Sequence, residues 1–134
     1  MGSRNSSMEN LVKTNKIEKS FWEGKKVLVT GHTGFKGSWL TIWLNNLGAK
    51  VYGISLSPNQ KPSLFEKANL ERYCDSIICD IRDYENTEKQ IKEINPEIIF
   101  HLAAQPLVKE SYQNPLNTYS TNIMGSINIL NISR

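Results

Sequence analysis

The sequence predicts an α/β protein built on a doubly wound parallel sheet of four strands, and three observations predict it. A continuous apolar run, Val27–Val29, leads directly into three glycines spaced three residues apart. A helical pattern and then a second apolar run follow these glycines, so that strand, helix and strand occupy residues 26–56. Short apolar runs then alternate with helical patterns to the end of the chain, as in parallel α/β sheets. We therefore expect a Rossmann-type fold.

The first strand is expected at residues 26–30, and the glycine loop after it is the main candidate site. Strand, glycine turn and helix together place free N–H groups and the positive end of a helix dipole around a phosphate. Gly31 would permit the tight turn, Gly34 the approach of a pyrophosphate, and Gly37 close packing of the helix on the sheet. The flanking strands favour dinucleotide binding over a simple turn. A triphosphatase loop is excluded because Lys36 precedes the last glycine instead of following it.

The first helix is expected at residues 37–47 and should end at Gly48, a typical helix-terminating residue. The pattern predicts one apolar stripe facing the sheet, made of Leu40, Trp43, Leu44 and Leu47. Trp39 lies one turn before Trp43, and core packing of both is favoured over stacking on a ligand.

The second strand, expected at residues 50–56, ends without the acidic residue that commonly binds the adenosine ribose of NAD. No arginine stands there to hold the extra phosphate of NADP. Ser55 or Ser57 could donate to the ribose instead. This position therefore does not decide between the two cofactors.

The remaining elements follow the same alternation. We expect a short helix at 63–68, a strand at 76–79, a helix at 86–94, a strand at 97–102, a loop to Pro115, and a final helix from 116 with Tyr119, Ile123, Ile127 and Leu130 facing inward.

Three further positions stand where strands end, at the edge of the sheet where ligands bind in this class of fold. Asp80 could accept from the exocyclic amine of adenine while the next N–H, that of Ile81, meets the ring. Ala103 and Ala104 are small where a cofactor would cross the edge. His101 is interpreted as a hydrogen-bonded core histidine in preference to a catalytic one.

Composition limits the class of protein. The 134 residues fit one domain or part of one, and the net charge of +3 comes from scattered residues, so neither nucleic-acid nor membrane binding is expected. Residues 1–20 are interpreted as a disordered leader or a tag remnant, and 21–134 as the cofactor-binding domain. Cys74 and Cys79 have neither redox nor zinc spacing, so we expect free thiols, no metal site and a cytoplasmic location.

Several longer motifs resemble one family. VTGHTGFKGSWL (29–40), PSLFE (62–66), DIRD (80–83), PEIIFHLAAQPLV (96–108) and TYSTNIMGS (118–126) are similar to the amino-terminal part of extended short-chain dehydrogenases/reductases, and among these to the CDP-glucose 4,6-dehydratases. The Thr-Gly-x-x-Gly-x-x-Gly core is common to the superfamily, whereas the His-Thr-Gly-Phe-Lys-Gly and Ala-Ala-Gln-Pro-Leu-Val forms are narrower.

The resemblance implies a role for each matching residue. NAD would be held by Gly31, Thr33, Gly34, Phe35, Gly37, Ser55, Asp80, Ile81, Ala103, Ala104 and Gln105. Ser111 and Tyr112 would face the sugar nucleotide, CDP-glucose. Asn122 matches an Asn-x-x-Gly position with a structural or proton-relay role. A homo-oligomer of the complete protein is also implied.

The reaction implied by the resemblance is an internal oxidation and reduction: hydride leaves carbon 4 of the sugar for NAD, water is lost across carbons 5 and 6, and hydride returns to carbon 6. The superfamily's base is the tyrosine of Tyr-x-x-x-Lys, and none of the five tyrosines has lysine four positions later. We therefore interpret the chain as a truncated NAD-binding domain without the substrate domain, inactive alone and serving deoxysugar synthesis for polysaccharides. Two alternatives remain open: another sugar-nucleotide dehydratase or epimerase, and a non-catalytic dinucleotide-binding module.

Overall fold

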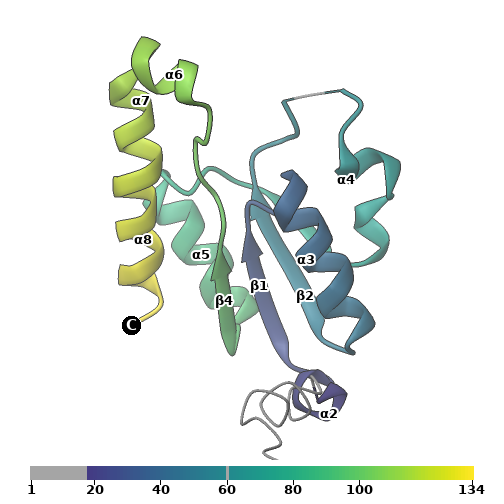
Figure 1. The fold of residues 1–134 in the computed structure, drawn as a ribbon. Helices are drawn as coiled ribbons and strands as arrows, with labels where there is room; N and C mark the ends of the chain where they lie inside the picture. The colour runs from purple at the N-terminus through teal and green to yellow at the C-terminus, as the bar shows by residue number, and fades with distance from the viewer. Residues whose placement is uncertain (1–17, 60) are drawn as a thin grey trace, which may run out of the picture.

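A computed structural model describes residues 18–59 and 61–134, and its centre is one sheet of four parallel strands (Figure 1). The strands lie in the order β3-β2-β1-β4, with bounds β1 Lys26–Thr30, β2 Lys50–Ser55, β3 Asp75–Ile78 and β4 Ile98–His101. Each predicted strand is confirmed, with ends shifted by one residue at most. The reversal of strand order between β1 and β4 marks the position at which doubly wound sheets bind ligands.

Helix α3 (Phe35–Asn46) covers one face of the sheet (Figure 1). The core between this helix and the sheet contains Val27, Val29 and Val51 from the strands and Leu44 from the helix. The predicted end of this helix is confirmed: Gly48 has φ +95°, its N–H donates to Asn45 O, and the next N–H, of Ala49, donates to Leu44 O. These two bonds make a Schellman motif, in which the glycine takes the left-handed conformation.

The predicted apolar stripe of α3 is confirmed for Leu44, which is buried, and for Leu40, which packs against the core, but the expected core packing of Trp39 and Trp43 is wrong. The buried positions are Gly37, Ser38, Thr41 and Leu44, whereas Trp39 and Trp43 are 55% and 52% exposed. The cause is steric: a Cβ at Gly37 would lie 2.1 Å from Gly31 O, so the Gly37 side of the helix must face the glycine turn. At 100° per residue, Trp39 and Trp43 then lie about 200° and 240° around the helix axis.

The other face is covered by α5 (Tyr84–Ile94) and α8 (Gly125–Ile132) (Figure 1). Ile91 and Ile94, the predicted inward residues of α5, are buried there with Leu28, Ile54 and Ile129. Each fully buried aliphatic side chain of this kind contributes roughly 1.5–3 kcal/mol to folding.

The predicted inward face of the last helix is wrong too. This helix runs through α7 (Pro115–Tyr119), a π-helical segment (Ser120–Met124) and α8. Its buried residues are Gly125 and Ile129, and a Cβ at Gly125 would lie 2.5 Å from Ile81 Cδ1. The four residues expected to face inward are instead 48–66% exposed: Tyr119, Ile123, Ile127 and Leu130.

Shorter helices complete the fold. They are α2 (Lys19–Trp22), α4 (Leu64–Lys67), the 3-10 turn Leu70–Arg72, and α6 (Val108–Gln113). Helix α6 lies inside the segment expected to be a loop, and α2 begins inside the predicted leader, whose residues 1–17 lie outside the described residues. Within the described ranges no helix is long and apolar enough to cross a membrane. Cys74 and Cys79 are free, as predicted, and both are buried.

Candidate functional site

The glycine loop lies at the carboxyl edge of the sheet, the upper edge in Figure 1, between the end of β1 and the start of α3. Gly31 has φ +77°, and its N–H donates to Ile54 O at 2.8 Å. A Cβ at this position would lie 2.7 Å from the Ala103 nitrogen. The turn therefore needs glycine both for its conformation and for its contact with the loop after β4.

The amides that begin α3 include free donors. Gly34 N–H is occupied, because it donates to Gly31 O at 3.1 Å. The N–H groups of Phe35 and Lys36 have no acceptor within the part of the chain that the structure describes. Among the described residues the bend is open: Gly34 and Lys36 are exposed, and Phe35 is 71% exposed. Bare first-turn amides at the positive end of a helix dipole suit a phosphate or diphosphate.

Thr33 and Ser55 are brought together at the end of β2. Thr33 Oγ1 donates to Leu56 O at 2.8 Å and lies 2.8 Å from Ser55 Oγ. Because a hydroxyl carries one proton, Ser55 must be the donor of the second bond. Ser55 Oγ is then left with an acceptor position, while the hydroxyl of Ser57 is exposed, and a ribose contact of either serine stays a prediction.

His32 is a buried residue whose role the sequence reasoning missed. Its Nε2 lies 2.7 Å from Ser76 Oγ, and its ring occupies the space above Gly53, where a Cβ would lie 2.3 Å away. Burial lowers the pKa of His32 to about 4, so the ring is neutral near pH 7. The sequence signal for this role was Gly53 in β2, because a glycine at that position leaves room for the His32 ring. His32 thus anchors the glycine loop to β2 and β3.

Asp80 and Ile81 follow β3 at the same edge. The Asp80 carboxylate is bound by Arg82, which holds the pKa of Asp80 below its usual value. The Ile81 side chain is buried in the core, while its N–H has no acceptor within the described ranges. An ionised carboxylate beside a free N–H can pair with the amine and ring nitrogen of an adenine.

The loop after β4 is held from the last helix. Asn122 pairs with the backbone of Gln105 in both directions, with Gln105 N to Oδ1 at 2.8 Å and Nδ2 to Gln105 O at 3.1 Å. The Gln105 side chain donates to Thr118 Oγ1 at 2.9 Å. Asn122 thus positions this loop, which brings Ala103 beside Gly31 and leaves Ala104 exposed.

His101 is hydrogen-bonded on both nitrogens, as predicted. Its Nδ1 lies 2.7 Å from Thr30 Oγ1 and its Nε2 lies 2.9 Å from Ser126 Oγ. Since Ser126 donates its proton to Asn122 O, Nε2 must carry the hydrogen and Nδ1 must accept from Thr30. Burial lowers the pKa of His101, which fits this neutral tautomer. The histidine ties β1 and β4 to the last helix.

The two residues expected to face a sugar lie on α6. Tyr112 is 84% exposed, and Ser111 donates its hydroxyl to Val108 O at 2.6 Å. The structure does not bring either side chain to the glycine loop. The described residues contain no group of three metal-ligating side chains.

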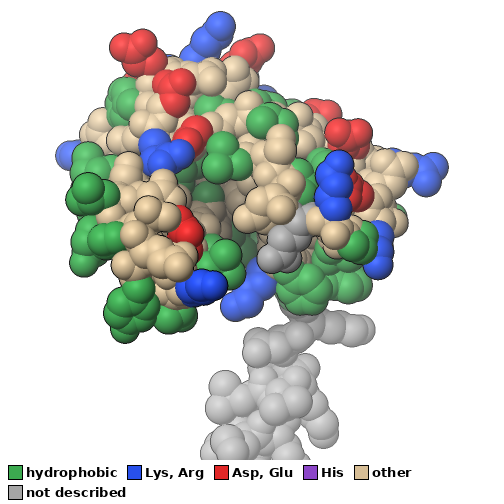
Figure 2. Space-filling view, turned by 90° about the horizontal axis from the view of Figure 1, so that it is seen from above, with side chains coloured by type: hydrophobic (Ala, Val, Ile, Leu, Met, Phe, Trp, Pro, Cys, Tyr) green, Lys and Arg blue, Asp and Glu red, His purple; other side chains and the backbone are tan. Residues whose placement is uncertain are grey.

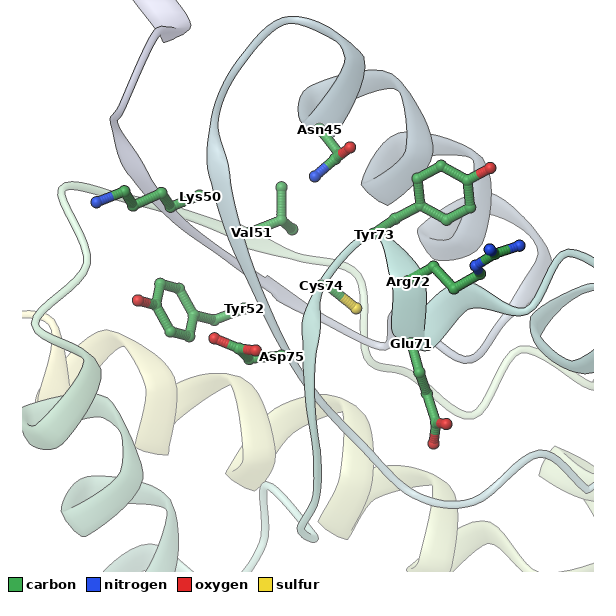
Figure 3. Close-up of a pocket in the computed structure, with 9 residues that line it drawn as sticks. All are labelled: Asn45, Lys50, Val51, Tyr52, Glu71, Arg72, Tyr73, Cys74 and Asp75. Carbon is green, nitrogen blue, oxygen red and sulfur yellow. The ribbon is translucent and has the colours of Figure 1, made fainter.

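A cavity of about 260 Å³ lies at the opposite edge of the sheet, where β2 and β3 begin (Figure 3). Its walls include Lys50, Tyr52, Arg72 and Asp75, with both charges represented. Burial, with Asp75 and Glu71 nearby, raises the pKa of the Cys74 thiol to about 12. A thiol that stays protonated is no nucleophile, so this cavity is separate from the candidate site in place and chemistry.

Comparisons with known proteins agree with this geometry. The model of the GDP-mannose 4,6 dehydratase family matches residues 28–134. The chain is 55% identical over 114 residues to the CDP-glucose 4,6-dehydratase of Salmonella typhimurium, covering 85% of this chain and 32% of that protein. It is 32% identical to the GDP-mannose 4,6-dehydratase of Yersinia enterocolitica, covering 82% and 31%.

Among solved structures, the UDP-glucose 4-epimerase of Stenotrophomonas maltophila, described with bound NAD and formylated UDP-arabinopyranose, has a TM-score of 0.71 at 30% identity. The match covers 81% of this chain and 33% of that one. The chain spans about a third of the length of the relatives it matches. Fold, glycine loop and relatives thus agree on one class of protein.

Proposed function

Since this chain belongs to the GDP-mannose 4,6 dehydratase family, we propose that it is the cofactor-binding part of an NAD-dependent CDP-glucose 4,6-dehydratase. One observation carries the choice of substrate: the identity of 55% with a CDP-glucose 4,6-dehydratase, against 32% with a GDP-mannose 4,6-dehydratase of similar coverage. The protein would convert CDP-glucose to CDP-4-dehydro-6-deoxyglucose and water, as a hydro-lyase of deoxysugar and polysaccharide synthesis.

The glycine loop supports NAD as the cofactor. The free N–H groups of Phe35 and Lys36 would bind the diphosphate, and Asp80 with the Ile81 N–H would bind the adenine. NAD, when bound, supplies the reversible hydride acceptance that a dehydration with internal oxidation and reduction requires. Ala103, Ala104 and Gln105 would border the ribose and nicotinamide, with Asn122 keeping their loop in place.

Substrate contacts and assembly belong to the same proposal. Ser111 and Tyr112, on α6, would contact the sugar nucleotide. A homo-oligomer is supported by the apolar side chains left exposed on α7 and α8. A cytoplasmic location is supported by the two buried, free cysteines.

The deciding experiment supplies the full-length protein separately with CDP-glucose, dTDP-glucose, GDP-mannose and UDP-glucose, and follows the 4-keto product. We expect turnover of CDP-glucose at least ~100-fold above the others, which corresponds to roughly 2.7 kcal/mol of transition-state discrimination. Epimerisation of UDP-glucose, or preference for another nucleotide, would contradict the substrate assignment. Calorimetry with NAD and NADP separately tests the cofactor, and NAD binding without any turnover would favour the non-catalytic module.

A further inference from the structure

The turn after β3 contains an ion pair with unusually complete geometry. Arg82 Nε lies 3.0 Å from Asp80 Oδ1 and 2.9 Å from Oδ2, and Nη2 also donates to Oδ2. The Arg82 backbone N–H donates to Oδ1 at 2.9 Å. One residue therefore holds the carboxylate by both its side chain and its backbone, which fixes the plane of the carboxylate as well as its position.

Arg82 is itself held by the last helix. Its Nη1 donates to Asn117 Oδ1, on α7, at 2.8 Å. One further asparagine of this helix reaches the same turn, because Asn128 Nδ2 donates to Ile81 O at 2.9 Å. The turn after β3 is thus attached to the last helix at two points, the Arg82 side chain and the Ile81 carbonyl.

Stability alone gives little reason for this arrangement. The side chains of Asp80 and Arg82 are 29% and 36% exposed, and ion pairs with this much solvent contact typically contribute no more than about 1 kcal/mol. A fixed carboxylate matters more for recognition. An acceptor that is already oriented does not lose conformational entropy when a ligand's amine binds to it.

We propose that Arg82 is a positioning residue for the adenine end of a dinucleotide: held by Asn117, it orients the Asp80 carboxylate toward the exocyclic amine. The inference rests on the proposed function, since it needs a dinucleotide at this edge of the sheet. Arg82 acts through Asp80 and has no contact of its own with the reacting atoms. The Asp80 side chain is still 29% exposed, which leaves room for a ligand beside it.

The test measures dissociation constants by calorimetry for NAD and for nicotinamide hypoxanthine dinucleotide, in which a carbonyl replaces the exocyclic amine. The full-length wild-type protein is compared with Arg82→Gln, Asn117→Ala and the control Arg72→Gln, an arginine at the opposite edge. We expect Arg82→Gln to weaken NAD binding roughly tenfold, Asn117→Ala to weaken it about threefold, and Arg72→Gln to leave it unchanged. The hypoxanthine analogue should bind wild type and Arg82→Gln with equal affinity.

This comparison distinguishes positioning from general damage to the fold. Equal loss of affinity for both dinucleotides in Arg82→Gln, or no loss for NAD, would overturn the inference alone. Absence of NAD binding by the wild-type protein would overturn the proposed function together with it. If Arg82→Gln does not fold, Asn117→Ala decides the matter, because it removes the tether and keeps the ion pair: a selective loss for NAD supports the inference, and an unselective loss overturns it.

Discussion

At the scale of single residues, the three glycines of the loop serve different physical purposes, and this difference can be measured. Gly37 is closed by the backbone, since a Cβ would meet Gly31 O at 2.1 Å. Gly34 has an ordinary φ of −75°, and a Cβ would meet its nearest neighbour at 3.3 Å, with open space beyond. Gly37 is therefore needed for folding, whereas Gly34 is needed chiefly for access of a ligand to the loop.

We expect Gly37→Ala to destabilise the fold by about 3 kcal/mol or more, because the added methyl group can only be accommodated by moving α3. Gly34→Ala should cost less than about 1 kcal/mol of stability and yet weaken dinucleotide binding at least ~10-fold, because the methyl group occupies the place of the diphosphate. Urea unfolding measures the first effect and calorimetry with NAD the second.

Gly24→Ala serves as the control for the glycine variants. Gly24 has φ +74°, and no atom lies within 4 Å of an added Cβ. The Gly24→Ala variant should lose about 1 kcal/mol of stability, because alanine is disfavoured at a positive φ, and its affinity for NAD should be unchanged. Equal binding by wild type and Gly34→Ala would show that the diphosphate does not approach this bend.

His32 predicts how stability depends on pH. Its pKa is about 4 in the fold, against 6.5 for the ordinary group, because the ring is buried. As pH falls, His32 therefore binds a proton in the unfolded chain before it does so in the folded protein. The stability that follows from this difference is complete above pH 6.5 and is lost progressively down to about pH 4. The loss should be of order 3 kcal/mol. Urea unfolding between pH 7 and pH 4 should show a flatter profile for His32→Asn than for wild type, and parallel profiles would contradict the prediction.

At the scale of elements, the sequence predicted the strands better than the faces of the helices. The strands were found because buried parallel strands are continuous apolar runs, such as Val27–Val29. The placement of the α3 tryptophans in the core and the predicted inward face of the last helix were wrong for one shared reason. In each helix a glycine, Gly37 or Gly125, contacts the neighbouring element most closely. Glycine has no apolar side chain, so the apolar pattern missed these contacts. It placed the inward face at the tryptophans and isoleucines on the other side of each helix.

Parts of the candidate site were similarly out of reach from sequence. The order of glycines predicted the loop and its free amides. The inward turn of the Thr33 hydroxyl and the pairing of Arg82 with Asn117 depend on contacts between residues 23 and 35 positions apart, for which one sequence has no pattern. Helix α6 was missed because its six residues carry no apolar period of their own.

The link between β1, β4 and the last helix depends on one hydroxyl, and we expect Thr30→Val to lower stability by about 2–3 kcal/mol. The valine keeps the shape but removes the donor to His101 Nδ1 and the acceptor of the Ala103 N–H, and both of these hydrogen bonds are partly buried. Thr30→Ser keeps the hydroxyl and should lose only about 1 kcal/mol for the missing methyl group. Urea unfolding of the two variants is the measurement, and equal losses would mean that the hydroxyl network adds nothing.

At the scale of the whole molecule, the topology divides the surface by purpose. The carboxyl edge gathers the glycine loop, the Asp80 turn and the loop held by Asn122, which follow β1, β3 and β4 of the same sheet. The opposite edge holds two cavities of mixed charge, of about 260 and 200 Å³. Viewed from the carboxyl edge, apolar side chains gather on the side formed by the last helix (Figure 2). This side therefore exposes a group of apolar side chains to water.

The last helix should therefore drive self-association of the 134-residue chain. Its exposed apolar residues recur every three or four positions along one side: Leu116, Tyr119, Ile123, Ile127 and Leu130. This spacing is that of helices packed against each other, and a continuous apolar surface of this kind is rare on monomers. We expect the mass measured by sedimentation velocity to rise with concentration, and the combined change Ile123→Lys and Leu130→Lys to return it to that of a monomer. Trp39→Lys, on the exposed side of α3, is the control and should leave association unchanged. A monomer with a sharp thermal transition independent of concentration would contradict the prediction. If only Trp39→Lys abolished association, the associating surface would lie on α3 instead of the last helix.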